Sequence, residues 1–232
     1  MFLTRIEINQ RRRATRQVLA NPHRMHGAVT ACFPRSVDPG RVMWRLDERE
    51  DGVFLFVLSS LPPPDATSLV EDYGWPQFES PWQSKEYQPV LDAVQNGRQF
   101  QFRLRANPVR NVLEPANDQV QAGNSGSGEV RRIRGKRVGH VTVAQQRHWL
   151  LTRASRWGFT MGDENAPSAD VVERKVWTFA KKSRTVTLST AVFEGILTVT
   201  DQGELRRRLL DGFGPAKAYG CGLMTLAPFS SP

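Results

Sequence analysis

The sequence has very little cysteine, because Cys32 and Cys221 are the only two in 232 residues. Two cysteines are too few for a disulfide framework or a four-cysteine zinc site, and they fit a reducing compartment. The sequence also lacks any run approaching the roughly 20 apolar residues of a membrane span. The stretch from Met1 to Ile6 lacks the long apolar core of a signal peptide. We therefore expect a cytoplasmic protein with no membrane partner.

Acidic side chains are also scarce relative to basic ones. The chain has 23 aspartates and glutamates against 32 lysines and arginines, a net charge of +9 and an isoelectric point near 10.2. Arginine dominates the basic residues, and its planar guanidinium fits phosphate and stacks on bases. The charge favours a nucleic acid as partner first and an anionic membrane surface second, with a merely basic surface as the alternative.

The first half of the chain shows strand and helix patterns in a recognisable order. We expect strands and helices at residues 2–8 (strand), 22–32 (helix), 42–46 and 53–58 (strands), a short helix after Asp65, and 99–105 (strand). Residues 74–97 are rich in proline, tryptophan and glutamine and are expected to form a loop. The order β-α-β-β-α-β is the ferredoxin-like arrangement, which also builds RNA-recognition domains.

The second half repeats this order. A helix over 142–157, a hairpin of strands 171–179 and 185–200, a short helix near Leu205 and a last strand over 223–227 are expected. We predict an α+β fold of two tandem ferredoxin-like (RRM-like) domains. The predicted N-terminal domain covers residues 1–112, the C-terminal domain covers 133–232, and a flexible basic linker at 113–132 joins them.

Two histidines share one face of the expected helix at 22–32. His23 and His26 stand at i and i+3. They can be ordinary exposed residues of a core helix, or they can act as general acid and base. A metal site needs further ligands, and neither an H-E-x-x-H motif nor a nearby Cys/His cluster is present. We predict no metal and no cofactor.

Four glycines cluster between Gly212 and Gly222, with Lys217 among them. Such a cluster indicates positive φ angles or the close approach of something large, and a lysine inside it suggests a phosphate. It is not a Walker A loop, because Ala218 rather than serine or threonine follows the lysine. Phosphates of RNA or the first domain could approach its backbone, and a flexible surface turn is the alternative.

Four stretches together resemble a known family. In chain order they are Phe2–Ile6 leading to Leu19–His26, Phe102–Pro108, Ala191–Val199, and the glycine-rich stretch. In this order they resemble the CasE family, the repeat-processing endoribonucleases of type I-E CRISPR systems. The resemblance implies metal-independent cleavage of precursor CRISPR RNA at the 3′ base of the repeat stem-loop. It also implies that the protein keeps its crRNA product and joins other Cascade subunits, notably the backbone protein.

The resemblance places the family's catalytic histidine at His26. His23 occupies a position where relatives often have tyrosine, so its role in proton transfer or RNA orientation stays open. The predicted RNA contacts combine basic groups near the helix, the basic hairpin tip and the glycine-rich stretch: Arg5, Arg12, Arg13, Arg24, Lys181, Lys182, Arg184, Gly214, Lys217 and Gly220. One alternative is a non-catalytic subunit that binds an RNA hairpin in a ribonucleoprotein. Another is a basic assembly protein that binds no RNA.

Overall fold

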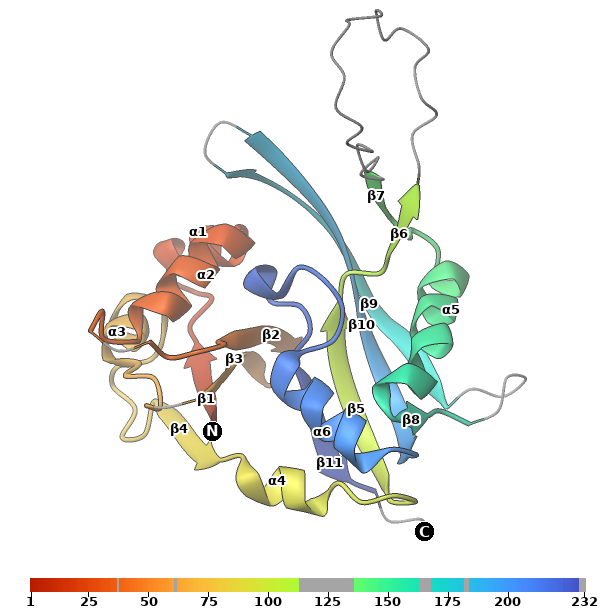
Figure 1. Ribbon diagram of the computed structural model, residues 1–232. Coiled ribbons are helices and arrows are strands. Elements are labelled where there is room, and N and C mark those ends of the chain that lie inside the picture. The colour runs from red at the N-terminus through yellow and green to blue at the C-terminus, as the bar shows by residue number, and fades with distance from the viewer. Residues whose placement is uncertain (37, 61, 113–135, 163–167, 182–183, 230–232) are drawn as a thin grey trace, which may run out of the picture.

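The structure is a computed structural model that describes residues 1–36, 38–60, 62–112, 136–162, 168–181 and 184–229. Two antiparallel sheets of four and five strands lie side by side, and a two-stranded ribbon extends from the second (Figure 1). The predicted linker at 113–132 lies outside the described residues. No helix among the described residues is long and apolar enough to cross a membrane.

The first sheet has the strand order β2-β3-β1-β4. Its elements are β1 (Phe2–Ile8), α1 (Arg13–Leu19), α2 (Pro22–Ala31), β2 (Met43–Arg49), β3 (Gly52–Ser59), α3 (Thr67–Tyr73) and β4 (Trp82–Glu86). Ile6 and Leu55 of the sheet are buried together with Met25 and Val29 of α2. The helices therefore cover one face of the sheet, as the ferredoxin-like order requires.

The second sheet repeats the arrangement with the strand order β11-β5-β10-β8, and β9 also pairs with β10. Its elements are β5 (Gln99–Ala106), α5 (Val143–Ala154), β8 (Phe159–Thr160), β9 (Ala169–Lys181), β10 (Arg184–Val199), α6 (Gln202–Asp211) and β11 (Met224–Pro228), with the ribbon strands β6 (Val109–Val112) and β7 (Lys136–Gly139). Trp149 of α5 and Leu205 of α6 pack with Leu104 and Phe193 of the sheet. The fold is therefore α+β with two tandem ferredoxin-like units.

The sequence assigned one strand to the wrong sheet. Residues 99–105 do form a strand, but β5 pairs with β10 and β11 rather than completing the first sheet. The fourth strand of the first sheet is β4, which lies in the stretch 74–97 that was expected to be loop and which pairs with β1. Helix α4 (Gln88–Ala93) lies there too. The change of sheet therefore falls between β4 and β5, earlier than the predicted boundary after residue 112.

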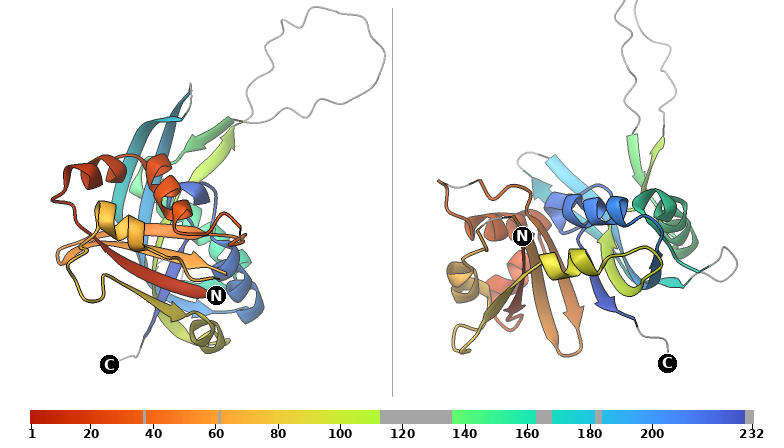
Figure 2. Two further views of the ribbon diagram at one scale, coloured as in Figure 1. Left: turned by 90° about the vertical axis from the view of Figure 1, so that its left-hand side faces the viewer. Right: turned by 60° about the horizontal axis from the view of Figure 1, so that its bottom comes forward.

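Strands β9 and β10 continue past the sheet as a long hairpin. Their pairing runs from Gly195 opposite Ala169 to Arg184 opposite Lys181. In Figure 1 this hairpin rises beside α1 and α2, and in the left view of Figure 2 its end projects beyond the rest of the second sheet. A segment of the second unit thus reaches the helices of the first.

A buried arginine joins the two units. Arg45 of β2 is completely buried, and its guanidinium donates to the backbone oxygens of Arg103 at 2.6 Å and Leu223 at 3.0 Å. It also donates to the Thr225 hydroxyl at 2.9 Å and to both carboxylate oxygens of Asp47 at 2.8 Å. A buried charge is tolerated only when it is paired and hydrogen-bonded, so this network fixes how the first sheet sits on the second.

Candidate functional site

Helix α2 begins at a strong cap and presents its histidines outward. The Asn21 side chain accepts hydrogen bonds from the backbone N–H groups of His23 at 3.0 Å and Arg24 at 3.3 Å, and Pro22 starts the first turn. Met25 and Val29 are buried against the sheet. The predicted helix is therefore confirmed, and His23 and His26 lie on its other side, both half-buried.

His26 has the environment of a group available for proton transfer. Burial lowers its pKa below the ordinary 6.5, and the nearby charges of His23 and Lys181 lower it further. Its buried Nδ1 has no hydrogen-bond partner among the described residues. The imidazole is therefore neutral near pH 7. Its Nδ1 is not used in a hydrogen bond within the described part of the protein.

The hairpin and the glycine-rich stretch meet beside this histidine. The Lys181 ammonium lies 3.0 Å from the hydroxyl oxygen of Tyr219, which belongs to the 3-10 turn η2 (Lys217–Tyr219). The Tyr219 ring packs edge-on against Phe179, with ring centres 5.1 Å apart. The site is therefore assembled from α2 of the first unit and from β9 and η2 of the second.

The glycine-rich stretch packs closely against the first unit. This confirms the expectation that the first domain could approach its backbone. A Cβ added at Gly220 would lie 2.6 Å from the Trp44 ring, and one at Gly212 would lie 2.4 Å from the Met43 sulfur. Both glycines have positive φ, at +76° and +83°. Gly214 packs against Trp149. RNA contacts at Gly214 and Gly220 stay predictions.

The Lys217 ammonium is directed at its own unit. It donates to the backbone oxygen of Asp211 at 2.5 Å, at the end of α6. Burial, followed by the charge of Arg41, lowers its pKa below the ordinary value. Lys217 therefore satisfies a helix end, and an RNA contact there would have to compete with that bond.

Two of the predicted basic contacts, Arg5 and Arg12, interact with other parts of the protein. Arg5 lies on the sheet face opposite α2, because its neighbour Ile6 packs under the helices, and its guanidinium stacks over Phe54 at 5.4 Å. The structure therefore does not bring Arg5 to the histidines. Arg12 donates to the Glu71 backbone oxygen at 2.5 Å.

The remaining predicted basic contacts are exposed. Arg13, Arg24, Lys181 and Arg184 are all open to solvent. Lys182, at the hairpin tip, lies outside the described residues. RNA binding by these side chains stays a prediction.

A second basic cluster lies away from the histidines, and its arginines were not among the predicted RNA contacts. Arg110 of β6, Arg137 of β7 and Arg153 of α5 line a pocket of about 480 Å³ together with Gly214 and Pro215. No carboxylate among the described residues pairs with these three arginines within 4.0 Å. Burial lowers the pKa of nearby His140, and Arg110 and Arg153 lower it further. We call this group the arginine pocket.

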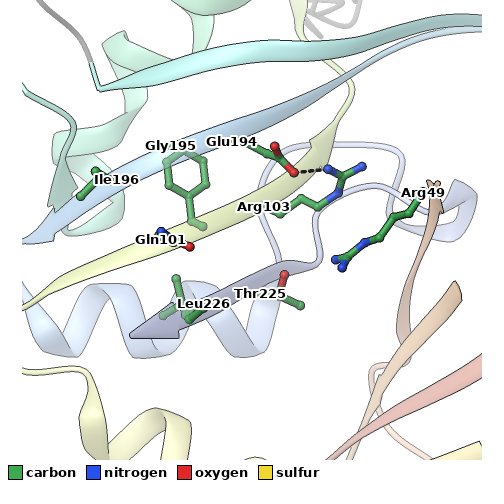
Figure 3. Close-up of a pocket in the computed structure, with 10 residues that line it drawn as sticks. Arg49, Gln101, Arg103, Glu194, Gly195, Ile196, Thr225 and Leu226 are labelled. Atoms are coloured by element: carbon green, nitrogen blue, oxygen red, sulfur yellow. Dashed lines mark hydrogen bonds and ion pairs between the residues drawn. The ribbon is translucent and has the colours of Figure 1, made fainter. Parts of the chain in front are cut away.

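The cleft in Figure 3 differs from the arginine pocket because its central arginine has carboxylate partners. It has a volume of about 470 Å³ and lies between Arg49 at the end of β2 and the open face of the second sheet. Its central Arg103 pairs with Glu194 and also with Asp47, whose oxygen lies 3.2 Å away. The central guanidinium of this cleft is therefore paired within the described part of the protein, unlike those of the arginine pocket.

Tyr219 was missed as a site residue because its contacts are far apart in sequence. Its position beside Lys217 in a glycine-rich stretch was the only local signal. A group of three or more histidine, cysteine or acidic side chains suited to a metal ion does not occur in the part of the chain that the structure describes.

Comparisons with known proteins agree with the resemblance found in the sequence. A family model described as CRISPR associated protein matches residues 1–228. The chain is 30% identical to the CRISPR-associated endoribonuclease Cse3 of Thermus thermophilus, over 98% of this chain and all of that protein. It is 31% identical to the CRISPR system Cascade subunit CasE of Escherichia coli K12, over 89% of this chain and 92% of the relative.

A solved structure supports the same relationship. Thermus thermophilus Cse3 bound to an RNA representing a pre-cleavage complex superposes with a TM-score of 0.73 at 29% identity, covering 98% of both chains. The matches extend over both ferredoxin-like units and their order. The chain therefore belongs to the CRISPR-associated protein family, and its resemblance to CasE is confirmed.

Proposed function

We propose that this protein is an endoribonuclease that cleaves precursor CRISPR RNA at the 3′ base of the repeat stem-loop. The observation that carries the proposal is His26, an unoccupied imidazole with a lowered pKa beside His23 and Lys181. The relatives named as endoribonuclease and Cascade subunit support the same reaction and the same assembly. In this proposal the mature crRNA stem-loop stays bound, and other Cascade subunits, notably the backbone protein, bind next to it.

RNA supplies the nucleophile in this reaction. The ribose 2′-hydroxyl attacks the adjacent phosphorus, the bond to the 5′-oxygen of the next nucleotide breaks, and a 2′,3′-cyclic phosphate remains. His26 accepts the 2′-hydroxyl proton, a role that needs the neutral imidazole that a lowered pKa provides. The leaving 5′-oxygen takes up a proton, and His23, on the same helix face, is the candidate donor.

Negative charge grows on the phosphoryl oxygens during this step. A fixed cation near those oxygens lowers the barrier, and Lys181 is the cation whose charge reaches His26 from the hairpin. No step requires a metal ion, so the proposed reaction is metal-independent and uses no cofactor.

Unpaired positive charge supports RNA as the partner. The arginine pocket lacks carboxylate partners among the described residues, although other arginines of the chain, such as Arg105 with Glu173, have them. Guanidinium groups without protein partners suit the phosphates of a nucleic acid. Both cysteines are free and buried, so a reducing compartment, the cytoplasm, is the proposed location.

The proposed reaction can be tested with a labelled repeat hairpin RNA in the presence of EDTA. We expect one cut at the 3′ base of the stem and a 2′,3′-cyclic phosphate end. A 2′-deoxyribose just upstream of the cut should allow binding and prevent cleavage. Cleavage of that substrate, or activity only with magnesium, would exclude 2′-hydroxyl attack.

The alternative functions predict different outcomes in the same assay. A non-catalytic RNA-hairpin-binding subunit would bind the RNA and leave it intact. A basic assembly protein would show no salt-sensitive RNA binding. The unpartnered His26 favours the enzyme over both.

A further inference from the structure

Lys181 is an exposed lysine whose ammonium is nevertheless held in one place. It is the last residue of β9, and a lysine side chain there would ordinarily sample many rotamers. Its Nζ lies 3.0 Å from the Tyr219 hydroxyl oxygen, and both β9 and η2 contact α2, the helix that carries His26. Because the lysine carries only donors, the tyrosine oxygen accepts this bond.

Tyr219 is itself fixed by its surroundings. It ends the 3-10 turn η2, which is bounded by two left-handed residues, Ala216 with φ +64° and Gly220 with φ +76°. Its ring packs edge-on against Phe179, beside the buried cluster of Trp177 and Leu188 at the base of the hairpin. The hydroxyl oxygen therefore has a defined position relative to the hairpin.

We propose that Tyr219 is a positioning residue of the cleavage site, whose hydroxyl fixes the Lys181 ammonium beside His26. There the ammonium stabilises the negative charge that develops on the non-bridging oxygens of the scissile phosphate. This inference rests on the proposed cleavage function. Preorganising the cation before the RNA binds removes a reorganisation step from the reaction. Tyr219 acts only through Lys181 and need not touch the RNA.

The hydroxyl can be removed without removing the ring. Tyr219→Phe should keep the packing against Phe179 and lose the bond to Lys181. With saturating hairpin RNA in single-turnover assays, we expect the cleavage rate to fall roughly tenfold, the lower end of what a hydrogen bond to a charged group contributes. The dissociation constant of the RNA should stay within about twofold, because Lys181 keeps its charge.

A double-mutant cycle separates positioning from a general structural effect. Lys181→Met should slow cleavage at least as much as Tyr219→Phe, and adding Tyr219→Phe to Lys181→Met should cause no further loss. Tyr73→Phe, at the end of α3, is the matched control and should cut at the normal rate. Thermal melting of each variant verifies that it is folded.

Three results would overturn the inference. They are a normal cleavage rate in Tyr219→Phe, rate losses that multiply in the double variant, and a loss of RNA affinity that accounts for the whole rate change. Each requires a wild-type protein that cuts. A wild-type protein that binds the hairpin without cutting would instead refute the proposed function, and with it this role for Tyr219.

Discussion

Arg45 and Asp47, two residues apart on β2, face each other in a completely buried ion pair with two hydrogen bonds of 2.8 Å. Burial alone would raise the pKa of Asp47, but the charge and hydrogen bonds of Arg45, followed by the charges of Arg103 and Arg105, hold it below its ordinary value. The carboxylate is therefore ionised throughout the neutral range. It neutralises an arginine whose remaining hydrogen bonds all reach the second unit.

Asp47→Asn should be strongly destabilising, because it leaves the Arg45 charge buried without its partner. We expect a loss of about 3–5 kcal/mol in the free energy of unfolding, measured with urea at pH 7. Glu48→Gln, the adjacent residue, is the control. Its pair with Lys175, at 3.4 Å, is about half exposed and should contribute less than about 1 kcal/mol. Equal losses in the two variants would show that the buried pair is not what joins the units.

The same carboxylate predicts a pH dependence of stability. A group whose pKa is depressed in the folded state stabilises the protein above its unfolded pKa, about 3.9 for aspartate, and this stabilisation disappears as the pH falls through the folded value. Wild-type protein should therefore lose stability with falling pH in the acid range. In Asp47→Asn this part of the acid sensitivity should be absent, as urea unfolding at pH values from 7 to about 3 would reveal.

Two glycines distinguish backbone strain from close packing. Gly97 and Gly220 have similar positive φ angles, +81° and +76°, but an added Cβ meets nothing within 4 Å at Gly97 and the Trp44 ring at Gly220. Gly97→Ala should cost only the left-handed backbone penalty, about 1–2 kcal/mol. Gly220→Ala should cost clearly more and should also reduce cleavage, since it pushes η2 away from Trp44 of β2 and so from the first unit. Similar losses of stability would mean that Trp44 can move aside.

His26→Ala should reduce single-turnover cleavage by about 10²–10⁴-fold, the usual contribution of one acid or base group. RNA binding should change little, since a neutral imidazole contributes no charge. His148→Ala, on the exposed side of α5, is the control and should leave the rate unchanged. A variant at position 26 that still cuts at a near-normal rate would remove His26 from the mechanism.

The cleavage rate should depend on pH through His26. A general base must be neutral, and burial, His23 and Lys181 all lower its pKa, so the rate should begin to fall only below the ordinary histidine value of about 6.5. Lys181→Met removes one of these causes, so the fall should move to higher pH. Lys181→Arg keeps the charge and should leave the profile in place. NMR titration of the His26 ring would measure the same shift directly.

The arginine pocket should contribute to the salt dependence of RNA binding. Removing one phosphate-binding side chain should reduce the slope of log K against log salt by roughly 0.7–0.9, so Arg110→Gln with Arg137→Gln should reduce it by about 1.4–1.8. Lys85→Gln with Arg98→Gln removes two exposed charges near β4 and α4, at the other end of the molecule (Figure 1). An equal change in slope in both double variants would mean that the pocket acts only through net charge.

The sequence predicted local structure well and long-range pairing less well. The helix at Pro22 follows from Asn21 and from the spacing of Met25 and Val29, which are local signals. The alternation of Phe100, Phe102 and Leu104 identified a strand and its buried face, but alternation contains no information about which strand lies next to it. Strand β4 was missed because it is an edge strand, and Gln83–Glu86 are exposed, so no apolar pattern marked it.

The same limit applies to the site: residues close together on one helix were predicted together, and contacts between distant segments were not. The two histidines lie on one helix, so their spacing places them together. Lys181 was expected as a contact of the hairpin tip with RNA, whereas the structure ties it to Tyr219 and places its charge at His26. That bond joins residues 38 positions apart and depends on how the two units dock, which no local pattern encodes.

The close approach of Gly212 to Met43 has a genetic consequence. Neither residue lies on α2 or beside Tyr219, yet both stand on the seam that brings the two halves of the site together. Met43 belongs to the buried cluster that continues into the second unit, so a substitution there that separates the units disturbs this core and also misaligns the reacting groups. Alleles at this seam should therefore lose cleavage activity and stability together, although neither residue touches the reacting groups.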